Sequence, residues 1–509
     1  MTNPNLFAAL AAAFPDDCSA TAIETDSGLF YSWQDLLDAT AMMANLLESL
    51  RLPQGARIAV QVEKSVEALL LYLATLRAGL VYLPLNTAYQ RGEMAYFIQD
   101  AQPAVVVCTG SNFSWISQMA FQAGTAHVFT LNDDRTGTLL QRAAAQPRSH
   151  AVAQVEAHDL AAIIYTSGTT GRSKGAMLSH ANLLSNAQVL KDYWDWRTPD
   201  QGGDVLLHAL PIFHVHGLFV AIHGALLNGS KMIWCSRFEP KTVLRLLPQA
   251  TVFMGVPTMY TRLLVEPGLQ PAVCKGMRLF ISGSAPMLME TFTAWQARTG
   301  HAVLERYGMS ETAMLTSNPC RPEDGERRGG TVGPALPGVE LRIVDDAGCD
   351  VPVGEIGGIV VRGPNVFKGY WNLPDKTREE FTADGFFKTG DVGRRDADGY
   401  VTIVGRSKDL IISGGYNVYP AEVEGVINAL PGVAESAVVG VPDADFGEVG
   451  VAVVVAKPGA QLDARALLAN LKSQLAAFKV PKRCFFVAEL PRNAMGKVQK
   501  NLLRSQYAQ

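Results

Sequence analysis

The stretch YTSGTTGRSKG, residues 165–175, combines three glycines, several hydroxyl side chains and two cations directly behind a short apolar run. Glycine lets backbone N–H groups turn toward an anion, hydroxyls donate further hydrogen bonds, and Arg172 and Lys174 neutralise charge. The spacing is not that of a Walker loop, because Ser173 stands where the second glycine should fall. A mobile surface linker is the alternative, but linkers rarely carry paired cations at the mouth of a buried strand. The stretch therefore predicts a loop that binds a polyphosphate.

Length and composition are those of an ordinary globular enzyme. The 509 residues exceed one ordinary core, so two or more domains are expected. The net charge of −4 gives no basic excess that would indicate a nucleic-acid or membrane partner. Seven scattered cysteines without metal-ligand spacing favour reduced thiols in the cytoplasm and no structural zinc. The start of the chain has no basic segment before its apolar run, so a secretory signal is not expected.

Helices and strands alternate along the part of the chain that precedes the polyphosphate loop. Helical periodicity over residues 31–50 and 66–78 alternates with apolar strands at residues 57–61, 80–86 and 104–108. This order predicts an α/β fold with doubly wound parallel sheets. From Gly329 onward, short alternating strands and turns predict a small β-barrel or distorted sheet packed on the α/β body. The last hundred or so residues have a strand and helix pattern of their own, typical of a small α+β domain.

Two histidines interrupt the apolar segment VLLHALPIFHVHGLFV, residues 205–220. His214 and His216 flank Val215, and on a strand their side chains would share one face. Two histidines without a third ligand make a poor metal site. Structural histidines with satisfied hydrogen bonds are the alternative to a functional role.

Three further segments place polar groups after predicted strands. VFMGVPTMYTRLL, residues 252–264, predicts a strand, a turn at Pro257 and a helix with Arg262 on its first turns. RLFISGSAPM, residues 278–287, predicts a strand that ends in a Gly/Ser turn. LERYGMSET, residues 304–312, supplies an aromatic ring, hydroxyls and a carboxylate. A purine favours an aromatic face, and Mg²⁺ favours carboxylate and phosphate oxygens, so this combination suits a nucleotide.

In this order the motifs resemble the adenylate-forming superfamily, which includes acyl-CoA synthetases, luciferases and the adenylation domains of peptide synthetases. The resemblance covers essentially the whole chain and is greatest to malonyl-CoA synthetases, through stretches such as GRSKGAMLSH, LPIFHVHGLF and GPNVFKGYW. It implies a large domain of residues 1–407 that binds ATP and the acyl substrate. It also implies a mobile C-terminal domain of residues 408–509, with a hinge at Lys408.

The resemblance further implies roles for individual residues. Catalytic roles fall on Lys497, Lys174, Arg172 and His214, and Mg²⁺ is expected at Glu311 and Thr169. Gly414 and Gly415 are expected along the path of the pantetheine arm of CoA. The expected contacts to ATP and AMP are Thr166, Ser167, Gly168, Thr169, Thr170, Ser284, Ala285, Pro286, Tyr307, Gly308, Ser310, Thr312, Asp391 and Arg406.

A dianionic substrate would need a cation in the acyl pocket, because a buried unpaired carboxylate costs several kcal/mol. We predict Arg262 for this role, since its helix follows a turn that lines the acyl pocket in the superfamily. The alternative is a surface arginine paired with a nearby acid. The remaining predicted substrate contacts are His214, Val215, Ser284 and Met314.

The predicted activity is an AMP-forming ligation of malonate to CoA through malonyl-AMP, with ATP, Mg²⁺ and CoA as the small molecules required. A synthetase for another short-chain or aromatic acid, such as methylmalonate, propionate or benzoate, is the alternative. A kinase or a nicotinamide-dependent dehydrogenase would show its own glycine-rich loop, and neither loop is found in the sequence. A regulator without catalysis would lack Lys497 or Glu311. The resemblance also suggests that Lys497 can be acetylated, which would make an acetyltransferase and a deacetylase partners.

Overall fold

The computed structural model describes residues 3–166, 173–413, 416–443, 445–493 and 496–508. One of its two large sheets has six strands in the order β6-β5-β3-β4-β7-β8. All neighbours in this sheet are parallel except β7 and β8, which form an antiparallel pair on either side of the predicted polyphosphate loop. Its strands are β3 (Arg57–Gln61), β4 (Val81–Pro84), β5 (Val105–Cys108), β6 (His127–Thr130), β7 (Leu160–Thr166) and β8 (Lys174–Ser179).

The second large sheet has eight strands in the order β14-β13-β12-β11-β9-β10-β1-β2. Its central strands are parallel, whereas β2 and β14 pair antiparallel at the two edges. The prediction of doubly wound parallel sheets therefore holds for the interior of each sheet, and antiparallel strands make both sheets mixed. Its strands are β1 (Thr21–Thr25), β2 (Phe30–Ser32), β9 (Val205–His208), β10 (Lys231–Trp234), β11 (Val252–Gly255), β12 (Leu279–Ser282), β13 (Leu304–Met309) and β14 (Ala313–Ser317).

Helices cover these sheets, and one of them is completely buried. Every residue of α3 (Val66–Arg77) is buried, which agrees with its nearly uninterrupted apolar sequence. Tyr72 of α3 hydrogen-bonds His223 of α8 at 2.8 Å and thereby ties the two halves of the body together. The other helices of the body are α1 (Leu6–Ala11), α2 (Trp33–Ser49), α4 (Arg91–Ala101), α5 (Phe113–Gln122), α6 (Thr138–Ala143), α7 (His180–Tyr193), α8 (Ile222–Leu227), α9 (Pro240–Leu246), α10 (Pro257–Leu264) and α11 (Met289–Thr299).

The glycine-rich segment forms a third, antiparallel sheet in the order β15-β16-β17-β18. Register shifts between β16 and β17 and between β17 and β18 distort it. Among the described strands β15 does not pair with β18, so the sheet is the distorted sheet of the two predicted forms, open rather than closed. Its elements are β15 (Glu340–Val344), β16 (Gly357–Arg362), α12 (Pro374–Glu379), β17 (Phe387–Arg395) and β18 (Val401–Arg406).

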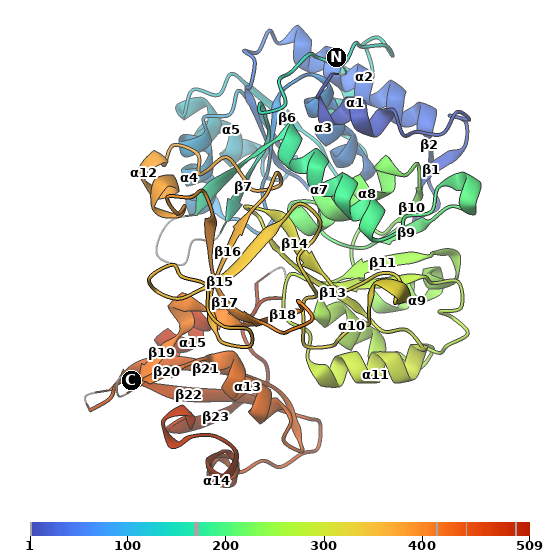
Figure 1. The fold of residues 1–509 in the computed structure, drawn as a ribbon. Helices are drawn as coiled ribbons and strands as arrows, with labels where there is room; N and C mark the ends of the chain where they lie inside the picture. Colours follow the sequence, from blue (N-terminus) through green and yellow to red (C-terminus); the bar gives the residue numbers. More distant parts are fainter. Residues whose placement is uncertain (1–2, 167–172, 414–415, 444, 494–495, 509) are drawn as a thin grey trace.

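A smaller C-terminal domain follows, shown below the rest of the molecule in Figure 1. It has hydrophobic clusters of its own on the two faces of its sheet. Lys457 contacts Glu290 of α11 at 2.6 Å and links this domain to the large body. The elements are β19 (Ile411–Ser413), β20 (Tyr416–Val418), α13 (Pro420–Asn428), β21 (Val433–Asp443), β22 (Gly447–Ala456), α14 (Ala464–Gln474), β23 (Arg483–Val487) and α15 (Lys500–Tyr507). In the described part of the chain, no helix has the length and apolar character needed to span a bilayer.

The histidine segment forms a strand only in its first four residues. β9 ends at His208, His214 lies in the following turn, and a π-helical turn, His216–Ala221, leads directly into α8. A proline stops the strand because Pro211 has no N–H to donate to a neighbour. A side chain at Gly217 would lie 2.0 Å from the carbonyl oxygen of Pro211, so only glycine allows this close turn. His214 and His216 therefore do not share the face of a strand.

Candidate active site

A buried carboxylate lies where the third sheet meets β13. Asp391 of β17 is paired in register with Arg406 of β18, and the Nε atom of Arg406 lies 2.9 Å from its Oδ1. The hydroxyl of Tyr307 on β13 donates a hydrogen bond to the other carboxylate oxygen. Burial, together with Asp391, raises the pKa of Tyr307 well above its usual value, so this hydroxyl stays protonated. The arrangement joins an aromatic ring, a carboxylate and a guanidinium, which suits the base and ribose of a nucleotide.

A second acidic group and a cation face each other nearby. The carboxylate of Glu311 accepts a hydrogen bond of 3.0 Å from Tyr370, and burial raises its pKa. Lys174 Nζ lies 4.1 Å from the centre of the Tyr370 ring and 3.5 Å from Glu380 Oε1. A single protein carboxylate beside a cation fits Mg²⁺, which commonly uses one or two carboxylates together with phosphate oxygens.

The turn after β12 brings a hydroxyl to the histidine segment. Ser284 has a positive φ of 71°, and its Oγ lies 3.2 Å from Nδ1 of His216. His214 lies two residues earlier, and burial, followed by the charge of Lys497, lowers its pKa to about 4. Val215 and Met314 are both buried apolar side chains. The predicted lining residues thus come with a second histidine, His216, which the sequence interpretation left without a role.

An arginine that the sequence interpretation missed lies at the centre of this region. Arg306 on β13 is 3% exposed, and its Nε and Nη2 atoms have no hydrogen-bond partner among the described residues. A Cβ atom at Gly283 would lie 2.3 Å from Nη1 of Arg306, so the glycine leaves the space that the guanidinium occupies. Burial lowers the pKa of Arg306 to about 9. The charge of Arg306, after burial, lowers the pKa of His216, which places the two side chains in one electrostatic environment.

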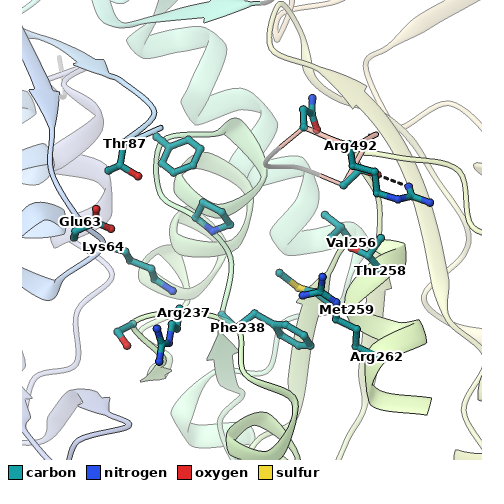
Figure 2. A pocket seen from close by; sticks show the side chains of 16 residues that line it. Glu63, Lys64, Thr87, Arg237, Phe238, Val256, Thr258, Met259, Arg262 and Arg492 are labelled. Atoms are coloured by element: carbon teal, nitrogen blue, oxygen red, sulfur yellow. Dashed lines mark hydrogen bonds between the residues drawn. The ribbon is translucent and has the colours of Figure 1, made fainter. Parts of the chain in front are cut away.

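Arg262, predicted as the buried cation, occupies a different environment. It is exposed on the outer face of α10, because the buried face of this helix is formed by Met259, Tyr260 and Leu263. Figure 2 shows Arg262 on the wall of an open pocket that also contains Lys64 and Arg237. The structure therefore does not place Arg262 with His216 and Ser284, whereas Arg306 lies against Gly283, the residue before Ser284.

The C-terminal domain brings Lys497 to the same site. Its backbone N–H donates to Oδ1 of Asn493 at 3.0 Å, which fixes the turn that carries it. Loss of contact with water lowers the pKa of Lys497, and the positive charge of Arg406 lowers it further. The carboxylates of Asp391 and Glu311 act in the opposite direction and raise this pKa. Lys497 is thus within electrostatic range of both acidic groups of the site. Lys408 lies in a 3₁₀ turn, Ser407–Asp409, between the third sheet and the C-terminal domain.

The remaining predicted contacts fall into two groups. Ala285 and Pro286 follow Ser284 at the edge of the site. Gly308 is in β13, Ser310 and Thr312 lie in the turn that joins β13 to β14, and Thr166 is at the end of β7. The Thr312 hydroxyl accepts from Met309 N at 3.2 Å and donates to Ala313 O at 3.1 Å, so it holds the turn itself. Seven predicted residues lie outside the described part of the chain: Ser167, Gly168, Thr169, Thr170, Arg172, Gly414 and Gly415.

Comparison with known proteins agrees with this architecture. Residues 7–371 match the AMP-binding enzyme family, and residues 422–497 match the AMP-binding enzyme C-terminal domain. The chain therefore belongs to the AMP-binding enzyme family.

Among solved structures, it is similar to the ATP-bound MatB of Rhodopseudomonas palustris, with a TM-score of 0.96 and 56% identity over 100% of this chain and 99% of that one. The malonate–CoA ligase of Arabidopsis thaliana is 34% identical over 96% of this chain and 86% of its own. The feruloyl-CoA synthase of an Amycolatopsis species is 35% identical over 96% of both chains. These relatives are named for different acids. The residues of the acyl pocket must therefore indicate which acid this chain activates.

Proposed function

We propose that the protein is an AMP-forming malonate–CoA ligase, which activates malonate as malonyl-AMP and transfers the acyl group to CoA. The observation that supports malonate as the substrate is the buried guanidinium of Arg306. A buried charge without a partner is strongly unfavourable, and a second carboxylate on the substrate removes that cost. An apolar or aromatic acid would leave the Arg306 donors unsatisfied in the complex.

The residues around Arg306 suit a short dicarboxylate. Arg306 offers Nε and Nη2 for two parallel hydrogen bonds to the carboxylate that does not react. Nε2 of His216 is likewise buried without a partner, and Ser284 adds a hydroxyl. Val215 and Met314 are placed to bound the space around the α-carbon.

In the first half-reaction the free carboxylate oxygen attacks the α-phosphorus of ATP, the acyl–phosphate bond forms, and pyrophosphate leaves. Lys174 and Lys497 neutralise charge that develops on the phosphates. Mg²⁺, held by Glu311, would supply further charge neutralisation at the phosphate oxygens. In the second half-reaction the CoA thiolate attacks the acyl carbon, and AMP leaves.

Several further features belong to this proposal. We place the boundary between residues 1–407 and 408–509 at the 3₁₀ turn of Lys408, where the chain leaves β18. Rotation there would let Lys497 and the Gly414–Gly415 segment act in turn. Acetylation of Lys497 would remove its charge, so an acetyltransferase and a deacetylase are the proposed protein partners. The seven free cysteines are consistent with the proposed cytoplasmic location.

The test compares Arg306→Leu with the wild type on malonate and on propionate, in which a methyl group replaces the distal carboxylate. The measurement is CoA-dependent AMP formation. Loss of a desolvated charge pair should reduce kcat/KM for malonate by at least ~10²-fold and leave propionate unchanged or improved. Arg262→Leu is the matched control and should keep malonate preference. An equal loss on both acids for Arg306→Leu would remove the support for malonate.

A further inference from the structure

Glu305, on β13 directly before Arg306, is a buried carboxylate that takes no part in the proposed mechanism. It is 5% exposed, its Oε2 accepts from Met287 N at 3.3 Å, and its Oε1 accepts from Gly330 N at 3.2 Å. In the described part of the chain, no cation lies within ion-pair distance of it. A buried carboxylate without a cation is costly, so these two N–H groups are what stabilises its charge. The carboxylate therefore bridges two separate backbone segments.

One of these segments is the turn that carries Ser284 into the acyl site. Consecutive residues of β13 contact its two ends. Arg306 lies against Gly283 at the first end, and the carboxylate of the residue before Arg306 holds Met287 at the other. The same turn thus contacts the guanidinium proposed to bind malonate and supplies the hydroxyl beside it.

This turn has few hydrogen bonds that fix its position. Among the described residues, its backbone N–H groups form two: Gly283 donates to Gly255 O at 3.3 Å, and Met287 donates to Glu305. The hydroxyl of Ser284 provides the remaining one. The bond to Glu305 therefore restrains the end of the turn that follows Ser284.

The other bridged segment is fixed independently of the carboxylate. Asn318 donates to Thr331 O at 2.9 Å and accepts from Arg328 N at 2.9 Å, on either side of Gly330. Asn318 is itself bound to the backbone of β13, because its own N–H donates to the carbonyl oxygen of Glu305 at 2.9 Å. If the bridge weakens, the turn of Ser284 is therefore the part that can shift.

We propose that Glu305 is a positioning residue of the acyl site, whose ionised carboxylate holds the turn of Ser284 in the geometry that binds malonate and whose protonation releases it. The inference rests on the proposed malonate–CoA ligase function. An ionised carboxylate accepts at both oxygens, whereas a protonated one carries a donor on one of them. Protonation therefore weakens the bridge to one of the two segments.

The protonation falls near neutral pH, where the other groups of the acyl site do not titrate. Burial raises the pKa of Glu305 to about 7, against the opposing effect of the two N–H groups. Burial lowers the pKa of His214 to about 4 and that of His216 well below its ordinary value, so both stay neutral above pH 6. Arg306, with a pKa of about 9, stays charged at neutral pH. The ionised fraction of Glu305 thus rises with pH through about 7.

The elements packed against Glu305 bring few other charges to it. β12, β14 and the turn of Ser284 contain no titratable side chain. On β13 the neighbouring charge is Arg306, which lies against the turn. On the segment of Gly330 it is Arg328, which pairs with Asp396 and Asp398. These pairings leave the two N–H groups as the partners of the Glu305 carboxylate.

The experiment follows ATP–pyrophosphate exchange, which uses no thiol, between pH 6 and 8.5. Glu305→Gln keeps the shape of the side chain and one acceptor oxygen but cannot ionise, so it imitates the protonated carboxyl group. Glu323→Gln, which removes an exposed carboxylate in the turn Pro322–Asp324, is the matched control. The wild type is measured on malonate and on propionate, the variants on malonate, and thermal unfolding reports whether each variant folds.

The kcat/KM of the wild type for malonate should rise about tenfold across this range, the effect of one hydrogen bond to a charged group. Glu305→Gln should stay at the low-pH level of the wild type at every pH, and Glu323→Gln should follow the wild type. Propionate, which lacks the distal carboxylate, should show no such rise.

A wild-type pH profile in Glu305→Gln would overturn the proposal, as would an equal rise on propionate. If Glu305→Gln does not fold, the wild type still decides, because a flat malonate profile would also overturn it. Absence of malonate-dependent exchange in the wild type at every pH would instead refute the ligase function itself.

Discussion

Substitution of Gly283 by alanine tests the position of the Arg306 guanidinium without removing any charge. The added Cβ atom would lie 2.3 Å from Nη1, 2.4 Å from Cζ and 2.8 Å from Nε of Arg306. Carbon makes favourable contacts at about 3.5 Å or more, so the guanidinium must move by roughly 1 Å. A shift of this size can cost about 10²-fold in rate when the displaced group positions a substrate. We therefore expect kcat/KM for malonate to fall ~10²-fold, while propionate, which does not use the guanidinium, is little affected.

The assay is CoA-dependent AMP formation on both acids, with thermal unfolding to confirm that the variant folds. Gly425→Ala serves as the control, because Gly425 lies in α13 and a Cβ atom there meets nothing within 4 Å. If Gly283→Ala keeps wild-type activity on malonate, the guanidinium does not bind the substrate from this position. If both acids lose activity together, the glycine serves the backbone rather than Arg306.

Three further predictions concern other parts of the molecule. Lys497→Ala should reduce malonate-dependent pyrophosphate exchange by ~10²–10³-fold and affect thioester formation from presynthesised malonyl-AMP far less; equal losses would contradict the role of Lys497. Lys408→Pro fixes φ in the 3₁₀ turn and should slow one half-reaction more than the other; wild-type rates in both would place the hinge elsewhere. Burial lowers the pKa of His180 to about 4 from 6.5, and its Nδ1 accepts from Leu6 N at 3.0 Å. The unfolded chain binds the extra proton, so stability should be greatest above pH 6.5 and decline toward pH 4. His180→Asn should weaken this decline in Tm between pH 7.5 and 5, and an unchanged decline would show that His180 does not contribute.

Much of the fold could be predicted because hydrophobic periodicity directly reflects burial. The strand at residues 57–61 was predicted with its observed bounds, and the apolar sequence of α3 matches a completely buried helix. The histidine segment could not be predicted in the same way. A short apolar run fits a strand or a buried helix equally well, and Pro211 and Gly217 decide between them through a close backbone contact.

The cation proposed for the acyl site shows which features could be predicted from the sequence and which could not. Met259, Tyr260 and Leu263 form the apolar stripe of α10, so helical phase alone turns Arg262 outward. Arg306 also left a signal, because Glu305 and Arg306 are consecutive charged residues directly after an apolar run, residues 302–304. Its contact with Gly283 depends on the packing of two separate segments, and only the three-dimensional structure supplies it.

Lys174 already has an acidic partner in this structure, and this has a consequence for product release under the proposed mechanism. Glu380 contacts both Lys174, at 3.5 Å, and Lys376, at 3.1 Å. When ATP recruits Lys174, Glu380 therefore keeps Lys376 and no acidic group is left uncompensated. A triphosphate carries enough charge to compete with Glu380, whereas the single phosphate of AMP competes poorly. If Lys174 binds the phosphates as proposed, we expect it to return to Glu380 after pyrophosphate and the thioester have formed, and this internal counter-ion would then favour release of AMP.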